Sequence, residues 1–196
     1  MKILVTIILF VWPFIQVKAQ EKLIKDIDFD GKNDTVYVDT DESVIICRLS
    51  TQQYKSVKSQ PIEILNAQSG VSATKNGFEF YNHWMRAGYH TQFRYDKPTK
   101  KIRLIGMSRY EFGPANNDGS GESSVNLLTG DYIGDWNFYD HLANNEKGEL
   151  IKIPTIKTKM RFDKIYLSGF SDKVYFDFSG RCAKLYYRQK KLLLSK

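Results

Sequence analysis

The sequence predicts an all-β protein with antiparallel strands in a single domain. From Thr35 onward, most apolar runs alternate with polar residues at a period of two, and Tyr, Phe, Val, Ile and Thr dominate them. Compact turn sequences separate these runs, and short connections are typical of antiparallel pairing. The chain of 196 residues has no linker-like or low-complexity stretch that would divide it.

The N-terminus predicts a secretory signal peptide over residues 1–19. Lys2 supplies the positive start, residues 3–15 form an apolar run, and Ala19 is a small residue where a signal peptidase cuts. The run is shorter than the roughly 20 residues that a spanning helix needs, although an uncleaved anchor is the alternative. We therefore expect a periplasmic or secreted domain, residues 20–196, that does not span the membrane once the signal is cleaved.

The basic balance does not by itself predict a nucleic-acid partner. The formal net charge is +7, but Lys and Arg are spread along the chain among acidic residues. The densest basic cluster is the C-terminal "YYRQKKLLLSK", which lacks any recognised nucleic-acid-binding module. We expect no nucleic-acid partner and interpret this tail as a solvated face.

The stretch "DIDFDGKNDTVYV", residues 26–38, predicts a cation site. Carboxylates packed this closely repel one another unless a cation or protonation relieves them. Oxygen ligands without thiolates or imidazoles favour calcium, and D-x-D-x-D-G-x-x-D follows the first nine positions of a calcium-binding loop. The predicted ligands are the side chains of Asp26, Asp28, Asp30 and Asp34 and the backbone carbonyl of Lys32.

The residues between these ligands are expected to shape the loop. Gly31 permits a sharp bend, while Ile27 and Phe29 point to the opposite side and bury against the sheet. The pattern departs from an EF-hand, because position twelve is Tyr37 instead of a bidentate glutamate and a strand follows. The missing oxygen is expected from water or from a distant residue, and the candidates stay open: Asp39, Asp41 and residues 116–118.

We expect this calcium ion to be structural, fixing the mature N-terminus to the sheet. A faint echo of the loop, "DFSGR" at 177–181, lacks the flanking acids, so it predicts no second metal.

The first strands are predicted as a hairpin, "TVYVD" and "SVIICRL", across the acidic turn 40–42. Pro98 favours a tight reversal at 96–100, and Gly130 is expected to need a positive φ. The helix candidates are short, around "FYDHLANNEKG" and "RQKKLLLS". The later predicted strands are "GFEFYNHW", "YHTQFRYD", "KKIRLIGMSRYEF", "SSVNLLTG", "DYIGDWNFY", "GELIKIP", "KIYLSGF" and "KVYFDF".

The chain has two cysteines, Cys47 and Cys182. Outside the cytoplasm an even count permits a disulfide, which would close a long loop. Both cysteines lie among apolar neighbours, so two buried thiols on separate strands are the alternative, and the sequence leaves this question open.

The acid-rich loop and its strand resemble the calcium loops of FG-GAP and VCBS-type β-propeller repeats. More broadly, the mature chain resembles small periplasmic propeller-like proteins related to inhibitors of invertebrate-type lysozymes. The resemblance rests on the loop, on the hairpin "FRYDKPTKKIRLIG" and on the strand and turn "SSVNLLTG". It implies a propeller-like or sandwich β-domain, structural calcium and a protein partner, in particular a peptidoglycan hydrolase.

One departure from that resemblance concerns inhibition. Such inhibitors often use a Ser-Gly loop followed closely by Tyr, whereas Ser120-Gly121 is followed by Glu122-Ser123. Many lysozymes are basic, as this chain is, so charge does not favour that target.

Aromatic residues near the predicted strand ends indicate a surface that could bind a protein or glycan partner, although each of these residues is also suited to the core. The partner-binding candidates are Ser120, Gly121, Tyr110, Trp84 and Trp136, with Tyr81, Tyr89 and Tyr139 nearby in the pattern.

The sequence does not predict an enzyme. His83 and His90 are expected on neighbouring strands, and Asp140-His141 would complete a zinc site or an acid–base pair. However, no dense ligand motif is present, and "GSGESS" does not match a nucleophile elbow. We therefore expect a calcium-binding module for a protein partner; the alternatives are an envelope scaffold, a glycan-binding protein or a hydrolase using His83, His90 and His141.

Overall fold

The computed structural model describes residues 21–195, and the predicted signal peptide lies outside the described residues. The elements from β1 to β6 are β1 (Lys22–Lys25), β2 (Asp34–Asp39), β3 (Val44–Arg48), the 3₁₀ turn η1 (Ser50–Gln52), β4 (Ser56–Lys58), β5 (Ser69–Thr74) and β6 (Gly77–His83). They are followed by β7 (Ala87–Asp96), β8 (Lys101–Glu111), β9 (Gly121–Asn126), β10 (Asp131–Asp140), α1 (Ala143–Glu146), β11 (Glu149–Lys152), β12 (Ile156–Lys159), η2 (Leu167–Gly169) and α2 (Asp172–Leu194).

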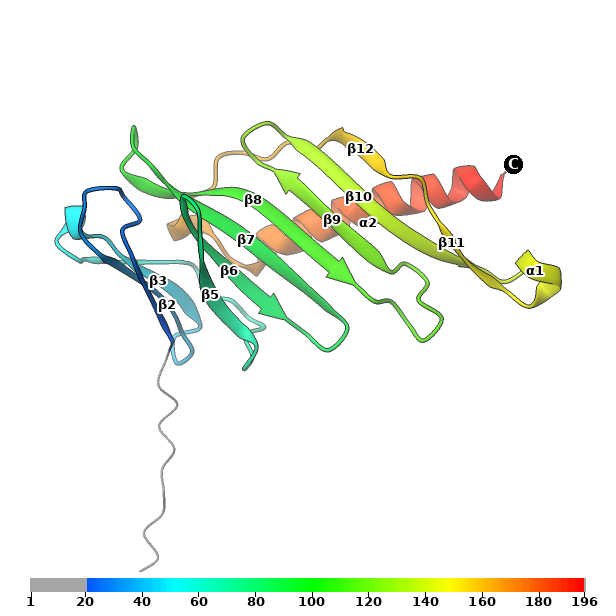
Figure 1. Ribbon diagram of the computed structural model, residues 1–196, viewed down its shortest axis with the longest axis horizontal. Coiled ribbons are helices and arrows are strands. Elements are labelled where there is room, and N and C mark those ends of the chain that lie inside the picture. The colour runs from blue at the N-terminus through cyan, green and yellow to red at the C-terminus, as the bar shows by residue number, and fades with distance from the viewer. Residues whose placement is uncertain (1–20, 196) are drawn as a thin grey trace, which may run out of the picture.

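The strands form two antiparallel sheets (Figure 1). A four-stranded sheet has the order β1-β2-β3-β4, and an eight-stranded sheet has the order β11-β10-β9-β8-β7-β6-β5, with β12 also pairing with β10. The prediction of an all-β, antiparallel, single-domain protein is confirmed. The arrangement is consistent with a sandwich, and the blades of a propeller are not seen among the described residues.

The predicted turns lie where the sequence places them. The first hairpin pairs Val38 with Ile45 across the acidic turn. The β7–β8 reversal pairs Asp96 with Lys101, and Gly130 has a φ of 76° between β9 and β10. In each case the residues that permit the bend were visible in the sequence.

β10 has two partners on the same side. Its second half, Asn137 to Asp140, pairs with β11, and its first half, Asp131 to Gly134, pairs with β12. Between the two short strands stands Pro154, which has no backbone N–H to donate.

The prediction of a strand at "KVYFDF" is wrong, because these residues begin α2. Buried positions on this helix recur at intervals of three or four residues, as a helix requires: Asp172, Tyr175, Phe178, Cys182 and Tyr186. The run "KVYFDF" contains β-favouring residues and is too short to distinguish a strand period of two from a helix period of 3.6. The packing of this segment against the sheet determines that it is helical.

Two neighbouring predictions are corrected in part. "KIYLSGF" forms a single bridge, Arg103 to Tyr166, and then the turn η2, so it is not a regular strand. "RQKKLLLS" is the end of the long helix α2, and "FYDHLANNEKG" contains the end of β10 and the short α1. Strands β1, β4, β5 and β12 are short and carry weak signals, and the sequence did not predict them.

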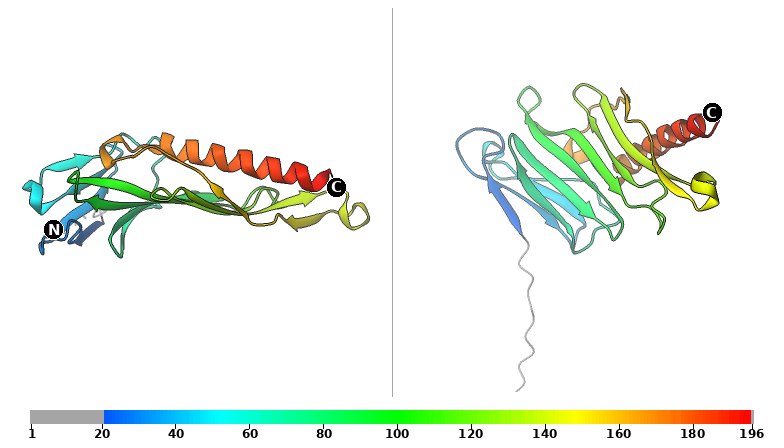
Figure 2. Two further views of the ribbon diagram at one scale, coloured as in Figure 1. Left: turned by 90° about the horizontal axis from the view of Figure 1, so that it is seen from above. Right: turned by 45° about the vertical axis from the view of Figure 1, so that its right-hand side comes forward.

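An apolar layer between α2 and one face of the eight-stranded sheet forms most of the core (Figure 2). Phe93 on β7 is fully buried, and its ring packs against Phe78 at 5.1 Å and against Phe170 at 5.2 Å between centroids. Tyr175 on α2 stacks on Tyr89 of β7 at 4.0 Å.

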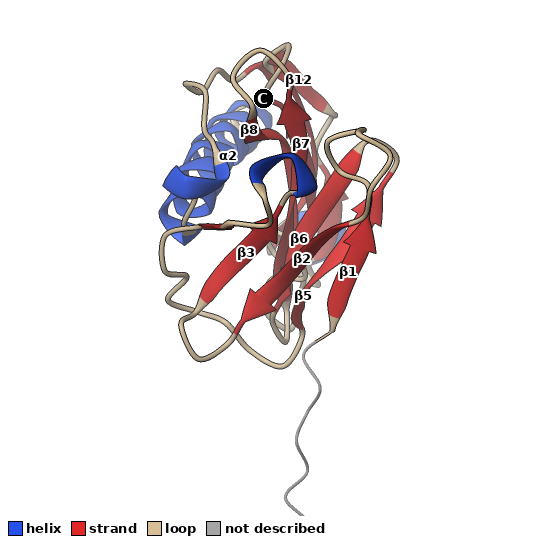
Figure 3. Ribbon diagram, turned by 90° about the vertical axis from the view of Figure 1, so that its left-hand side faces the viewer, coloured by secondary structure: helices blue, strands red, loops and turns tan. Residues whose placement is uncertain are grey.

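The four-stranded sheet joins the same core, and it lies at the end of the molecule that faces the viewer in Figure 3. Val36 and Ile45 are fully buried on its inner face, whereas Val44 and Ile46 form a small cluster with Tyr37 on the other face. The two sheets therefore belong to one domain.

Both cysteines are unpaired and buried, Cys47 on β3 and Cys182 on α2, so only the former is on a strand. Burial raises the pKa of each thiol above its ordinary value. Among residues 21–195, no helix combines the length and the apolar composition that crossing a bilayer requires.

We expect Phe93→Ala to lower the free energy of unfolding by about 3–5 kcal/mol, because it removes a buried ring and leaves a cavity. The matched control, Phe176→Ala on the outer side of α2, is expected to change it by less than about 0.5 kcal/mol. Urea unfolding measures both, and equal effects would contradict the assignment of the core to this layer.

Candidate functional site

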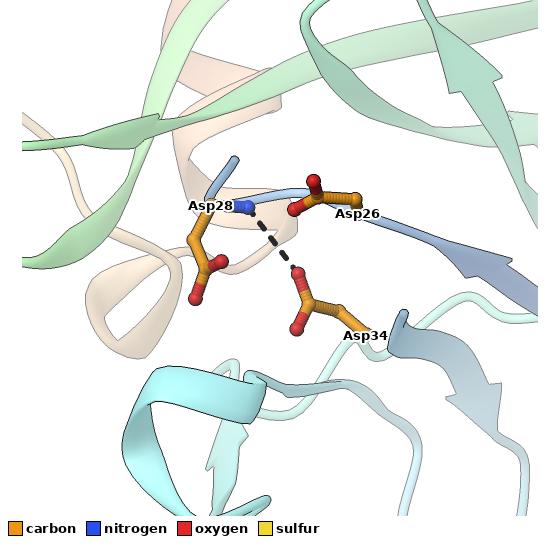
Figure 4. A group of neighbouring side chains, drawn as sticks. All are labelled: Asp26, Asp28 and Asp34. Carbon is orange, nitrogen blue, oxygen red and sulfur yellow. Dashed lines mark hydrogen bonds between the residues drawn. The ribbon is translucent and has the colours of Figure 1, made fainter. Parts of the chain in front are cut away.

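The acid-rich loop connects β1 to β2 and brings three carboxylates together. Asp26, Asp28 and Asp34 each offer an oxygen, and these three oxygens lie within 4.8 Å of one another. Figure 4 shows the three side chains facing a common centre. Among the described residues, this is the one group of three or more His, Cys, Asp or Glu side chains with such a geometry.

Asp34 ties three chain segments together and is fully buried. One carboxylate oxygen accepts hydrogen bonds from the backbone N–H groups of Ile27 at 2.7 Å and of Asp28 at 3.2 Å. The other accepts from the backbone N–H of Ser50 in η1 at 2.7 Å. Asp34 therefore holds the loop against the four-stranded sheet through hydrogen bonds from backbone N–H groups.

Asp26 shapes the turn itself. Its carboxylate accepts from the backbone N–H groups of Phe29 at 2.7 Å, Asp30 at 3.2 Å and Gly31 at 3.0 Å. Gly31 has a φ of 85°, which a glycine adopts without strain, so the sharp bend predicted at this position is present.

Asp28 is only 5% exposed, and half of its carboxylate has no partner. Oδ2 accepts a hydrogen bond from the Thr51 hydroxyl, but Oδ1 is buried and accepts none. A buried, unpaired carboxylate oxygen costs several kcal/mol by order of magnitude unless a cation or a donor satisfies it. The unsatisfied oxygen belongs to the group that faces the common centre.

Asp30 is turned out of this group. Its carboxylate accepts from the Ser50 hydroxyl at 2.7 Å and from the Lys32 backbone N–H at 2.8 Å. These two hydrogen bonds, that from Ser50 first, lower the pKa of Asp30 below its ordinary value. Of the four predicted carboxylate ligands, the structure brings together three, while Asp30 lies on the exposed side of the loop. Lys32, whose backbone carbonyl is the fifth predicted ligand, is an exposed residue.

The expectation for Phe29 is wrong, whereas Ile27 is fully buried as expected. Phe29 is 49% exposed with a φ of 65°, and the Lys97 ammonium lies 5.9 Å from the centre of its ring. The left-handed backbone at this residue breaks the strand-like alternation that would have turned its side chain inward.

The distant acids proposed as further ligands lie elsewhere. Asp39 is at the opposite end of β2 and accepts from the N–H groups of Asp41 and Glu42 at 3.1 Å in the hairpin turn. Asp118 accepts from the Lys190 ammonium at 3.0 Å. The loop is instead closed by η1, residues Ser50 to Gln52, which carries no acid, so no sequence signal marked it.

Two of the three predicted histidines form a smaller cluster on the face of the eight-stranded sheet opposite α2. His83 and His90 lie on neighbouring strands with 5.0 Å between ring centres, and Nδ1 of His90 is 3.3 Å from Glu79. Partial burial and then the neighbouring His90 lower the pKa of His83. His141 lies at the end of β10 against the ring of Tyr139, so the predicted trio does not form a metal-type group.

The same open face carries a row of side chains that the strand register places side by side. The row crosses five strands from His83 through Gly88, Tyr110 and Glu122 to Asp135. Gly88 leaves room for the ring of Tyr110, whose hydroxyl lies 3.1 Å from Nδ1 of His83. Glu122 and Asp135 are direct cross-strand neighbours, and like charges in such positions repel.

Beside this row lies a groove of about 350 Å³. Its floor is formed by the small residues Ser108 and Ser124, with His90 and Ile133 in the same register row. No ion pair among the described residues involves the acids Glu122 and Asp135 at its rim. The sequence analysis did not identify this groove, because it arises from cross-strand register.

The partner-binding candidates are dispersed. Trp136 is 2% exposed and contributes to the core, and Trp84 is half-buried against Tyr89 and Tyr175. Ser120 and Gly121 lead into β9, and the carbonyl of Ser120 accepts hydrogen bonds from the backbone N–H of Asn137 at 2.8 Å and from its side-chain amide at 3.4 Å. Of the five candidates, only Trp136 is buried, whereas Trp84, Tyr110, Ser120 and Gly121 are half-buried.

No family model matches this chain, and no curated protein or solved structure matches it either.

We expect Asp34→Ala to destabilise the protein in the presence of a chelator by roughly 3 kcal/mol or more, because three N–H groups lose their acceptor. Asp28→Asn is expected to change the metal-free stability by less than about 1 kcal/mol, since it removes an uncompensated charge. Urea unfolding with excess chelator tests both; equal losses would mean that the Asp28 charge is needed without metal.

Proposed function

We propose that this protein is an exported, calcium-stabilised β-module that binds a protein partner and is not an enzyme. The observation that carries the calcium proposal is the buried Oδ1 of Asp28, which has no hydrogen-bond partner within a convergent group of three carboxylates. A bound cation would supply the positively charged partner that this buried oxygen otherwise lacks.

The donor chemistry favours calcium over a softer metal. Calcium takes six to eight oxygen ligands, so Asp26, Asp28 and Asp34 would supply part of the shell and water or backbone oxygens the rest. The convergent group consists of three carboxylates and contains no Cys or His. Thiolates and imidazoles are the ligands that zinc and copper prefer.

We expect added calcium to raise the melting temperature of the chelator-treated protein. At a calcium concentration 100 times the dissociation constant, the stabilisation is about 2.7 kcal/mol. Asp28→Asn should lose this response, and the control Asp41→Asn, an exposed acid in the β2–β3 turn, should keep it. Differential scanning calorimetry measures the shift, and identical melting curves with chelator and with calcium would refute the site.

The proposed protein-binding surface is the end of the eight-stranded sheet formed by the β6–β7 turn and the β8–β9 loop. Met85 is 94% exposed and Phe112 is 52% exposed. The backbone N–H of Phe112 donates to the carbonyl of Arg86 at 2.8 Å, so turn and loop are joined. Exposed large apolar side chains on a fixed backbone are typical of an interaction surface.

A peptidoglycan hydrolase is the partner class that we propose, following the resemblance to periplasmic lysozyme inhibitors. A periplasmic or secreted location is part of the same proposal.

Glycan binding is the second candidate function, and the groove is the observation that favours it. Its hydroxyls, carboxylates and imidazole suit a hydroxyl-rich ligand, and the ring of Tyr110 offers a flat apolar surface beside them. The two candidates use different surfaces, so variants separate them.

We expect the immobilised protein to retain a hydrolase from an envelope extract, with mass spectrometry identifying it. Met85→Ser/Phe112→Ser should abolish retention by removing the apolar contacts. The control Ile24→Ser/Leu128→Ser, which removes two apolar side chains exposed elsewhere, should not.

The glycan alternative predicts the opposite pattern. Purified peptidoglycan fragments would then bind to the wild-type protein and to Met85→Ser/Phe112→Ser but not to Glu122→Gln/Asp135→Asn. Retention of a hydrolase by the apolar variant would contradict the protein-binding surface proposed here.

A further inference from the structure

The outward side of α2 carries a stripe of exposed residues at intervals of three and four. We call it the outer stripe. All of its members are exposed, and α2 forms the outermost layer of the molecule on this side (Figure 2). The outer stripe consists of Lys173, Phe176, Gly180, Lys184, Tyr187, Lys191 and Leu194.

Large apolar side chains on this side of the helix require an explanation. Phe176 is 44% exposed, Tyr187 66% and Leu194 56%. The inner side of α2 already buries Tyr175, Phe178 and other residues against the sheet, and the outer side of such a helix is normally polar. Within the described chain, the apolar members of the stripe face solvent.

The charge of the outer stripe has one sign. None of Lys173, Lys184 and Lys191 forms an ion pair in the described structure. The exposed acid nearest in sequence, Asp177, is paired with Arg181 at 2.8 Å. The stripe therefore alternates unpaired ammonium groups with apolar side chains along a helix of 23 residues, about 35 Å long.

This alternation selects among the possible occupants. A second copy of the chain would place the same lysines opposite one another, where they repel. A nucleic acid would neutralise the lysines but would leave Leu194 and Phe176 without apolar contacts. An anionic lipid surface accommodates both, since ammonium groups reach its phosphates while apolar side chains enter the headgroup boundary.

We propose that the outer stripe of α2 docks this protein on an anionic membrane surface, with the helix lying in the plane of the interface. The helix does not cross the bilayer in this arrangement. Because α2 covers one face of the eight-stranded sheet, the open face with its groove points away from the lipid.

The test uses the chain beginning at Gln20, which retains every element of the described structure and lacks the apolar N-terminal run. Flotation with phosphatidylcholine vesicles, with and without phosphatidylglycerol, should show binding only to the anionic vesicles. Each basic side chain near such a surface contributes about 1 kcal/mol. Lys173→Gln/Lys184→Gln/Lys191→Gln should therefore weaken partitioning on the order of 100-fold, at tenfold per 1.4 kcal/mol.

The matched control is Lys55→Gln/Lys75→Gln/Lys152→Gln, which removes the same charge from exposed lysines on other elements. It should weaken binding by less than about threefold through the net charge alone. Phe176→Ser/Tyr187→Ser/Leu194→Ser should also weaken binding, and Tyr187→Trp should give a blue-shifted emission with anionic vesicles only.

Three results would overturn the proposal. The first is an equal loss in the two lysine variants, which would indicate unspecific attraction. The second is binding of duplex DNA that survives Phe176→Ser/Tyr187→Ser/Leu194→Ser and is as strong as vesicle binding. The third is a dimer in sedimentation that the same apolar variant dissociates while vesicle binding is absent.

Discussion

The apolar packing of α2 on one face of the eight-stranded sheet is the constraint on which the rest of the structure depends. The helix contributes Tyr175 and Phe178, and the sheet contributes Phe80, Tyr89 and other rings. This layer buries one face of the sheet and one side of the helix. The opposite sides, the polar open face and the outer stripe, are therefore left free, and both are available to other molecules.

The acid-rich loop follows a different physical rule, because each of its acids needs donors or a cation, and Asp28 and Asp34 are buried away from water. Asp34 and Asp26 satisfy this condition with backbone N–H groups, and Asp30 does so at the surface with Ser50. Asp28 does not. Three of these acids therefore fix the conformation of the loop, whereas one oxygen of Asp28 has no partner. The sequence pattern alone does not distinguish Asp28 from the other three.

The sequence predicted the fold class and most strands of the large sheet, because alternation and turn residues are local signals. It identified the acid-rich loop and Gly31 for the same reason. It predicted only the end of α2 as helical, since the first turns of the helix are rich in β-favouring Val174, Tyr175 and Phe176. It could not identify the contribution of Ser50, nor the juxtaposition of Glu122 and Asp135, which depend on register and on contacts between distant segments.

The pairing of β10 with two short strands, β11 and β12, has a consequence for self-association. A long free strand at the border of a sheet offers unpaired backbone groups to neighbouring molecules, which is a route to fibrous aggregates. Here two short strands separated by Pro154 cover β10, and their exposed lysines Lys152 and Lys157 would repel an approaching copy. This border is therefore discontinuous and cationic, and it disfavours sheet extension from one molecule to the next.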